Sequence, residues 1–396
     1  MTNMYNPVTP ELVQALQEVV GDKYVKTDEE YLQQYQTDEE GNPHFFKKPE
    51  VVVFPGSTEE VAAIVKLANQ YKVPITPRSA GSNVACGAIP IYHGMVVELE
   101  RMNQILTLDA DNLYAVVQTG VITGQLQAEA KKHGLLYAGD PSSADSSQIG
   151  GNVANNAGGN KAVRYGTTRN QVHAIEVVLP NGEIANLGTR SKKNSTGYCL
   201  DQLVIGSEGT LGIITKATLK LLPLAPYKAD VLAVFTDQEK AVSLVPILLK
   251  AGLNPTSVEF MDNGFVRSAS DYSKIRLAHY EDGSYVILTL ETFDEDELEK
   301  KLEKLDELCR ENGADDVMIA DDRVWTVRKN CLESVRVLSK VMTSDDFVVP
   351  LDKIAQTINE LSKVAESYPF QVFTLAHAGD GNLHFSILKG NMTDEA

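Results

Sequence analysis

The stretch PEVVVFPGSTEEVAAIVKLANQYKVPITPRSAGSN, residues 49–83, carries the local signals that point to the fold. Its EVVVFPG run is short and β-branched, which is typical of a strand. Ser57 and Glu60 then form a capping-box pattern, and apolar residues recur at helical spacing up to Ala68. Pro74 ends this helix, and a glycine-containing loop follows. We therefore expect the first half of the chain to alternate strands and helices.

Three loops in this half are rich in glycine: PRSAGSNVACG (77–87), SSQIGGNVANNAGG (146–159) and GSEGTLG (206–212). Glycine lets a backbone approach a pyrophosphate closely and adopt the positive φ angles of anion-binding nests. The loops fit neither the Walker A pattern, because Ala162 follows the lysine of AGGNKAVR, nor the Rossmann fingerprint. The pattern alone leaves two interpretations open, a phosphate-binding surface or a set of turn-rich loops.

The second half begins after Pro223 and Pro226 and contains three units of strand, helix and strand. Within the first half, a hairpin is predicted at Asn181-Gly182. Three similar units favour one sheet with helices on one face, the α+β pattern. The main predicted strands are residues 230–235, 257–261, 285–291, 316–320 and 347–350, with helices over about 237–251, 294–312 and 351–368.

Near the end of the chain, HAGDGNLH (377–384) places two histidines around a glycine-rich turn. Neutral imidazole is a common ligand for Zn, Fe or Mn, and the turn lets His377 and His384 approach one ion. The alternative is a hairpin whose histidines are ordinary, partly exposed residues. Arg328, in VWTVRKN (324–330), has a planar guanidinium that can clamp a carboxylate, or it is a surface arginine on a helix.

Composition narrows the possible partners. The chain has 36 Lys and Arg against 54 Asp and Glu, a net charge of −18. Such a field repels nucleic acid and anionic lipid, so we expect neither as a partner. No apolar run is long enough for a membrane span, and the N-terminus lacks the features of a signal peptide. The four cysteines form no CxxC pair, which favours reduced thiols in a cytoplasmic protein.

The motifs, taken in order, resemble a known family. Residues 49–83, QIGGNVANNAGGNKAVRYGTTRNQV (148–172) and VIGSEGTLGIIT (204–215) resemble the FAD-binding domain of the vanillyl-alcohol oxidase/p-cresol methylhydroxylase superfamily. The chain is most similar to its 2-hydroxy-acid branch: FAD-linked D-lactate dehydrogenases, glycolate oxidase catalytic subunits and D-2-hydroxyglutarate dehydrogenases. The implied fold is α+β. An N-terminal helical segment (1–48) precedes a two-part FAD-binding domain of the p-cresol methylhydroxylase type (49–224) and a ferredoxin-like α+β cap domain (228–396).

The resemblance implies FAD contacts in all three glycine loops. Ser79 and Ser82 stand where the family usually has Gly and Thr. No histidine lies in residues 77–83, so noncovalent FAD is expected. The expected FAD-binding residues are Pro77, Arg78, Ser79, Ala80, Gly81, Ser82, Asn83, Pro141, Ser142, Ser146, Gly150, Gly151, Asn152, Asn155, Asn156, Gly206, Glu208, Gly212 and Ile213, with Asn382 beside the flavin ring.

The resemblance also implies a metal and a substrate site. HAGDGNLH matches the branch's metal motif, with His377 and His384 as catalytic ligands of Zn, Fe or Mn. In the family, a third ligand and the general base belong to a later motif, which would lie beyond residue 396. The expected fold is therefore C-terminally incomplete. Arg328 matches the arginine that binds the substrate carboxylate, which makes it the third expected catalytic residue.

The implied reaction is oxidation of a small D-2-hydroxy acid to the 2-oxo acid, with hydride transfer to flavin N5. The hydroxyglutarate enzymes carry a lysine just before the VP of FVVP, where this chain has Ser344, Asp345 and Asp346. This acidic pair disfavours a dicarboxylate and favours D-lactate or glycolate. The expected electron acceptor is an electron-transferring flavoprotein or an iron–sulfur subunit.

Two other functions remain open at this point. One is a catalytically inactive FAD-binding accessory subunit of a glycolate oxidase-type complex, which fits a chain without the later motif. The other is an oxidase that uses oxygen on an alcohol or amine, against which the histidine pair argues.

Overall fold

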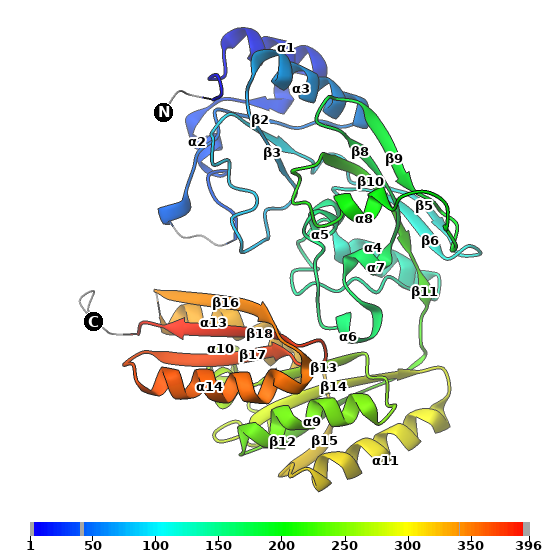
Figure 1. The fold of residues 1–396 in the computed structure, drawn as a ribbon, viewed down its shortest axis with the longest axis vertical. Coiled ribbons are helices and arrows are strands. Elements are labelled where there is room, and N and C mark those ends of the chain that lie inside the picture. The colour runs from blue at the N-terminus through cyan, green and yellow to red at the C-terminus, as the bar shows by residue number, and fades with distance from the viewer. Residues whose placement is uncertain (1–3, 40–42, 340, 391–396) are drawn as a thin grey trace. The chain divides into compact units, whose positions relative to one another are not determined.

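The computed structural model describes residues 4–39, 43–339 and 341–390 (Figure 1). The chain divides into two compact units. Unit 1 comprises residues 1–158 and 166–224, and unit 2 comprises Gly159–Tyr165 and 225–396. The short segment Gly159–Tyr165, which continues the glycine-rich stretch in the sequence, thus packs as part of unit 2. It is held there by Arg164, whose Nη1 donates to Thr256 Oγ1 at 3.0 Å and to the Glu291 carbonyl at 3.1 Å.

The first sheet of unit 1 contains the strands predicted around residues 49–83. Its order is β1-β2-β4-β3, with β2 and β3 parallel to β4. The N-cap of the predicted capping box is confirmed, because the Glu60 N–H donates to Ser57 Oγ at 3.2 Å. The Glu60 carboxylate accepts instead from the N–H of Gly56, one residue before the N-cap, at 2.6 Å. The elements are α1 (Pro10–Val20), β1 (Val25–Lys26), α2 (Glu29–Gln33), β2 (Val51–Val53), α3 (Thr58–Tyr71), β3 (Ile75–Arg78) and β4 (Met95–Glu98).

The second sheet of unit 1 is antiparallel throughout, in the order β5-β6-β10-β8-β9. The hairpin at Asn181-Gly182 is confirmed: it joins β8 to β9, and Gly182 takes a φ of +78°. The elements are β5 (Ile105–Asp109), β6 (Tyr114–Gln118), α4 (Thr123–Lys132), β7 (Leu135–Leu136), α5 (Ile149–Asn155), α7 (Thr168–Gln171), β8 (Val172–Val178), β9 (Ile184–Gly188), α8 (Leu200–Val204), β10 (Ile213–Lys220) and β11 (Leu222–Pro223).

Unit 2 is built on a seven-stranded sheet in the order β15-β12-β14-β13-β17-β18-β16. Its first four strands and the helices α9 and α11 have the ferredoxin-like arrangement that the sequence predicts. The elements are α6 (Ala162–Tyr165), β12 (Tyr227–Phe235), α9 (Gln238–Lys250), β13 (Ser257–Met261), α10 (Asn263–Ser273), β14 (Ser284–Thr292), α11 (Glu295–Glu311), β15 (Asp316–Ala320), α12 (Arg323–Lys329), α13 (Cys331–Leu338), β16 (Met342–Val348), α14 (Ile354–Glu366), β17 (Gln371–His377) and β18 (Asn382–Leu388).

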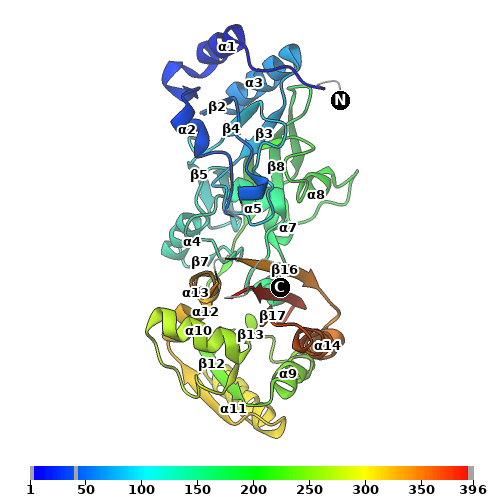
Figure 2. The same ribbon diagram turned by 90° about the vertical axis from the view of Figure 1, so that its left-hand side faces the viewer.

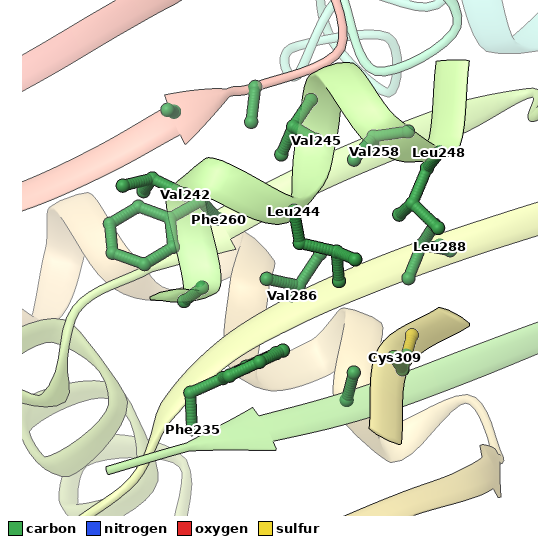
Figure 3. Close-up of a cluster of buried hydrophobic side chains, with 14 of the residues drawn as sticks. Phe235, Val242, Leu244, Val245, Leu248, Val258, Phe260, Val286, Leu288 and Cys309 are labelled. Carbon is green, nitrogen blue, oxygen red and sulfur yellow. The ribbon is translucent and has the colours of Figure 1, made fainter. Parts of the chain in front are cut away.

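Helices cover both faces of this sheet, so the prediction of helices on one face is wrong. On one face, α9, α11 and α14 pack over a buried cluster that includes Phe235, Leu244, Phe260 and Leu288 (Figure 3). On the other face, α10, α12 and α13 cover a second cluster of buried apolar side chains (Figure 2). The physical reason is that the central strands β12, β13 and β14 carry apolar side chains on both sides, so neither face can be left to water.

Among the described residues, no helix has both the length and the apolar character needed to cross a lipid bilayer.

Candidate functional site

Unit 1 contains a cavity of about 210 Å³ formed by the three glycine loops. That volume is several times the share of one water molecule, so it suits an organic group better than a single ion. The expected FAD-binding residues that line it are Pro77, Arg78, Ser79, Ala80, Gly81, Ser82, Asn83, Pro141, Gly150, Gly151, Asn152, Asn155, Glu208, Gly212 and Ile213. Of the others, Ser142, Ser146, Asn156 and Gly206 do not line it, while Leu99, Gln148, Ala157 and Ile214 line it without having been predicted.

Two glycines let the cavity's walls approach one another. A Cβ atom on Gly150 would lie 2.6 Å from the Cβ of Thr119, closer than real Cβ contacts allow. Gly209 has a φ of +75°, and its Cβ would lie 2.8 Å from Pro77 Cγ. Among the described residues, the buried Gln148 Oε1 has no hydrogen-bond partner. A backbone-lined hollow with an unpartnered polar atom fits a ligand that is polar and is contacted along its length, such as a dinucleotide.

Arg78 lines the cavity, but its guanidinium is bound to the protein. Its Nη1 donates to the Thr37 carbonyl at 2.7 Å, and its Nε lies 3.7 Å from Glu98 Oε2. Burial raises the pKa of Glu98 to about 8, and the Arg78 charge only partly opposes that rise. Arg78 therefore ties the segment before β2 to the first glycine loop, a role that the sequence motif did not reveal.

Unit 2 carries the second candidate site on the sheet face that α10, α12 and α13 cover. Residues directly opposite in antiparallel strands share a face, as do residues two apart along one strand. His377 pairs with Asn382, and His384 pairs with Asp346. Glu259 follows the same register, because Met261, two residues on, pairs with Leu375, two residues before His377. Four strands thus bring these polar side chains together on one face.

Glu259 is the centre of this cluster, and it was not predicted. Its side chain is 0% exposed, and both carboxylate oxygens lie within hydrogen-bonding distance of His377 Nδ1, at 2.8 and 2.9 Å. Although burial raises the pKa of Glu259, the charges of His377 and Arg328 and their hydrogen bonds bring it below its ordinary value. The sequence did hold one signal, a single charged residue inside the apolar strand SVEFM, because a buried carboxylate is rarely found without partners.

Arg328 reaches the same carboxylate from α12. Its Nε and Nη2 donate to Glu259 Oε2 at 3.0 and 2.6 Å. The Arg328 side chain is buried, with 9% of the residue exposed, so it is not the surface arginine of the alternative interpretation. These bonds use two of the guanidinium's five N–H groups, and the others make no hydrogen bond to the described residues. The outer edge of the guanidinium can therefore still bind a carboxylate.

The two histidine rings meet edge to face, with centroids 5.2 Å apart. Because Glu259 binds Nδ1 of His377, the opposite nitrogen Nε2 carries the lone pair whenever this ring is neutral. Burial, and after it the charge of the neighbouring His377, lower the pKa of His384 to about 4, so His384 is a neutral imidazole at pH 7. Both rings have the donor chemistry of a metal ligand.

The described residues do not complete a metal site, because they contain no group of three or more His, Cys, Asp and Glu side chains arranged to hold an ion. Catalytic metals are usually held by three protein ligands. Among the described residues, the histidine pair is thus a partial donor set.

Asp346 and Asn382 border the histidines. Asn382 Nδ2 donates to Asp346 Oδ1 and to the Phe347 carbonyl, the latter at 3.3 Å. Asp346 Oδ1 also lies 3.5 Å from His384 Nδ1. Asp345 pairs with Phe385 and so faces the opposite side of the sheet from Asp346. Of the acidic pair that the sequence singled out, only Asp346 faces the cluster.

The fold matches solved enzyme structures over nearly the whole chain. An alkyldihydroxyacetonephosphate synthase superposes with a TM-score of 0.81 at 20% identity, covering 98% of this chain and 82% of the other. A p-cresol methylhydroxylase superposes with a TM-score of 0.78 at 17% identity, covering 97% and 84%. Two family models also match, "FAD binding domain" over residues 49–188 and "FAD linked oxidases, C-terminal domain" over residues 224–396. These matches define the class, an FAD-linked oxidoreductase with the p-cresol methylhydroxylase-type fold.

The curated relatives narrow that class. A D-lactate dehydrogenase of Anaerostipes hadrus is 38% identical, covering 98% of this chain and 84% of the relative. A D-2-hydroxyglutarate dehydrogenase of Stutzerimonas stutzeri is 35% identical, with the same coverage of 98% and 84%. The glycolate oxidase subunit GlcD of Bacillus subtilis is 35% identical, covering 87% and 74%. The chain belongs to the family of FAD-linked oxidoreductases that includes these 2-hydroxy-acid enzymes, and the predicted resemblance is confirmed.

Proposed function

We propose that this protein is a dehydrogenase that oxidises a small D-2-hydroxy acid, D-lactate or glycolate, to the 2-oxo acid. The observation that carries the proposal is the cluster of unit 2. There the guanidinium of Arg328 has an edge that can bind a carboxylate, and it lies beside the imidazole rings of His377 and His384. A 2-hydroxy acid presents a carboxylate and a hydroxyl on adjacent carbons, which matches these two kinds of group. The names of the relatives support this substrate class.

In the proposed reaction, the free N–H groups of Arg328 bind the substrate carboxylate and thereby orient Cα and its hydroxyl. Nε2 of His377 takes a position from which its lone pair can receive the hydroxyl proton or hold a divalent metal. His377 and His384 would be the ligands of such a metal (Zn, Fe or Mn), and it would supply Lewis-acid polarisation of the hydroxyl. When bound, noncovalent FAD supplies the two-electron acceptor, flavin N5, that takes the hydride from Cα. The cavity residues of unit 1 would hold it.

Asp346 supports a preference for a monocarboxylate. Its side chain lies beside His384 on the same face of the sheet as the histidines. A second carboxylate on the substrate would meet this negative charge in place of a cation, which is unfavourable. We therefore propose D-lactate or glycolate in preference to D-2-hydroxyglutarate.

The reduced flavin must pass its electrons on. The word "subunit" in the GlcD name indicates that this relative works within a complex. We propose a protein acceptor, an electron-transferring flavoprotein or an iron–sulfur subunit, in the cytoplasm.

The test is the visible spectrum of the purified protein, recorded without oxygen before and after addition of D-lactate, glycolate or D-2-hydroxyglutarate with Zn²⁺ or Mn²⁺. We expect the flavin bands to bleach with D-lactate or glycolate. A flavin that binds but stays oxidised with every acid would overturn the proposal and favour an inactive FAD-binding accessory subunit. Arg328→Lys is the matched variant, since it keeps the charge but removes the planar fork.

A further inference from the structure

We propose that Glu259 is a positioning residue that sets the tautomer of His377 and the orientation of Arg328 at once. This inference rests on the proposed function for its catalytic meaning, but its structural content can be tested without turnover. The carboxylate is fully buried on β13, while its two partners come from α12 and from the end of β17. One side chain therefore joins three elements that contribute to the site.

The hydrogen bonds assign the proton on His377. Glu259 Oε2 already accepts from Nε and Nη2 of Arg328, at 3.0 and 2.6 Å. A carboxylate that accepts from a guanidinium has only acceptor oxygens to offer a third partner. His377 Nδ1, at 2.8 Å from Oε1, must then carry the hydrogen and donate it. In the neutral ring the lone pair is thereby placed on Nε2, the nitrogen that can face a substrate hydroxyl or a metal.

The same contacts fix Arg328. Two N–H groups on one edge of the guanidinium converge on a single oxygen, which sets the plane of the group and directs its other edge away from Glu259. The Glu259 charge also compensates the buried Arg328 charge, so the guanidinium can stay in this position without a substrate. The apolar neighbours of Glu259 on the sheet, Met261 and Ile287, offer no substitute acceptor.

The experiment measures the tautomer directly, in protein without added metal. Histidine is labelled with ¹⁵N, and two-bond ¹H–¹⁵N correlation spectra are recorded on the flavin-bound protein. The His377 signals are identified by their loss in His377→Gln. We expect wild-type His377 to be the Nδ1–H tautomer. In the double variant Glu259→Leu/Arg328→Met, which removes both charges and leaves no unpaired ion, we expect His377 to lose this single tautomer.

Asp346→Asn is the matched control, because Asp346 contacts His384 and not His377 in the described structure. It should leave the His377 tautomer unchanged. The inference is overturned if wild-type His377 carries its hydrogen on Nε2, or if the double variant keeps a single Nδ1–H tautomer.

A second variant, Glu259→Asp, keeps the charge but shortens the side chain by one methylene. We expect its affinity for Zn²⁺ alone, measured by titration calorimetry, and its kcat/KM for D-lactate to fall about 10–100-fold each. If the tautomer result is as expected but no 2-hydroxy acid reduces the flavin, the proposed function fails and the positioning role stands. If the flavin is reduced normally by Glu259→Asp with unchanged Zn²⁺ affinity, the positioning role fails and the proposed function stands.

Discussion

Unit 1 and unit 2 each bury one glutamate beside one arginine, and the two pairs differ in protonation. Glu98 lies 3.7 Å from Arg78, and its pKa is raised to about 8 by burial. Glu259 has contacts of 2.6–3.0 Å with Arg328 and His377, and its pKa is lowered in spite of burial. Burial is nearly complete in both, so the difference arises from the two close positive charges and their hydrogen bonds at Glu259, against one more distant guanidinium at Glu98.

The two buried glutamate–arginine pairs have different roles in the structure. Arg78 donates to backbone carbonyls and joins chain segments, so Glu98 is one neighbour among several. Glu259 is the only acceptor that Arg328 has among the described residues, and it also binds a histidine of the candidate site. We therefore expect substitutions at Glu98 to alter stability with pH, and substitutions at Glu259 to alter both stability and chemistry.

Removing the Glu259 charge should have the largest effect. Glu259→Gln leaves Arg328 buried without a counter-charge, which typically costs about 3–5 kcal/mol of unfolding free energy. Trp325 is the single tryptophan of the chain and lies in α12, so its fluorescence during urea unfolding reports on this unit. Glu98→Gln, the matched variant, should change this transition by less than about 1 kcal/mol. Equal effects of the two variants on the Trp325 transition would mean that Glu259 stabilises unit 2 no more than Glu98 does.

Glu98 should make the stability of unit 1 depend on pH. Its folded pKa of about 8 lies above the ordinary value of 4.5, so between these values the folded state holds a proton that the unfolded chain releases. The free energy of unfolding should fall as pH rises through this range, by roughly 1 kcal/mol per pH unit. Glu98→Gln should flatten that slope in circular-dichroism urea titrations at pH 5, 6.5 and 8. An unchanged slope would mean that Arg78 keeps Glu98 ionised.

Flavin binding should depend on the backbone of unit 1 more than on its charged pair. Gly150→Ala puts a Cβ 2.6 Å from the Cβ of Thr119, so a wall of the cavity must move. We expect the affinity for FAD to fall at least about tenfold, the equivalent of ~1.4 kcal/mol, in fluorescence titrations of the apoprotein. Gly158→Ala is the control, because its Cβ would meet no atom within 4 Å. Equal loss in both variants would locate the binding elsewhere.

The smallest effect is expected at the edge of the unit 2 cluster. Asp346→Asn removes an exposed negative charge beside His384, which should raise kcat/KM for D-2-hydroxyglutarate relative to D-lactate by about fivefold, or ~1 kcal/mol. Asp345→Asn alters the neighbouring residue on the opposite face and should leave the ratio unchanged. If Asp345→Asn changed the kcat/KM ratio more than Asp346→Asn does, the negative charges would act at long range and not through a contact within the cluster.

Sequence by itself determined the local elements and the family. The N-cap at Ser57, the Asn181-Gly182 hairpin and the turn between His377 and Asn382 are all present as the residues predict. These features depend on neighbours a few residues apart, so backbone propensity and side-chain capping are enough to specify them. The order of the glycine loops likewise identified the FAD-binding fold.

Tertiary structure alone decided which side chains share a site. Glu259 meets Arg328 across 69 residues and His377 across 118, contacts that no local pattern encodes. Tertiary packing also directs the Arg78 guanidinium to the Thr37 carbonyl, and it places α10, α12 and α13 over the second face of the unit 2 sheet. The physical reason is that strand register and packing bring distant residues together. The groups that then surround a buried carboxylate determine its hydrogen bonds and its pKa.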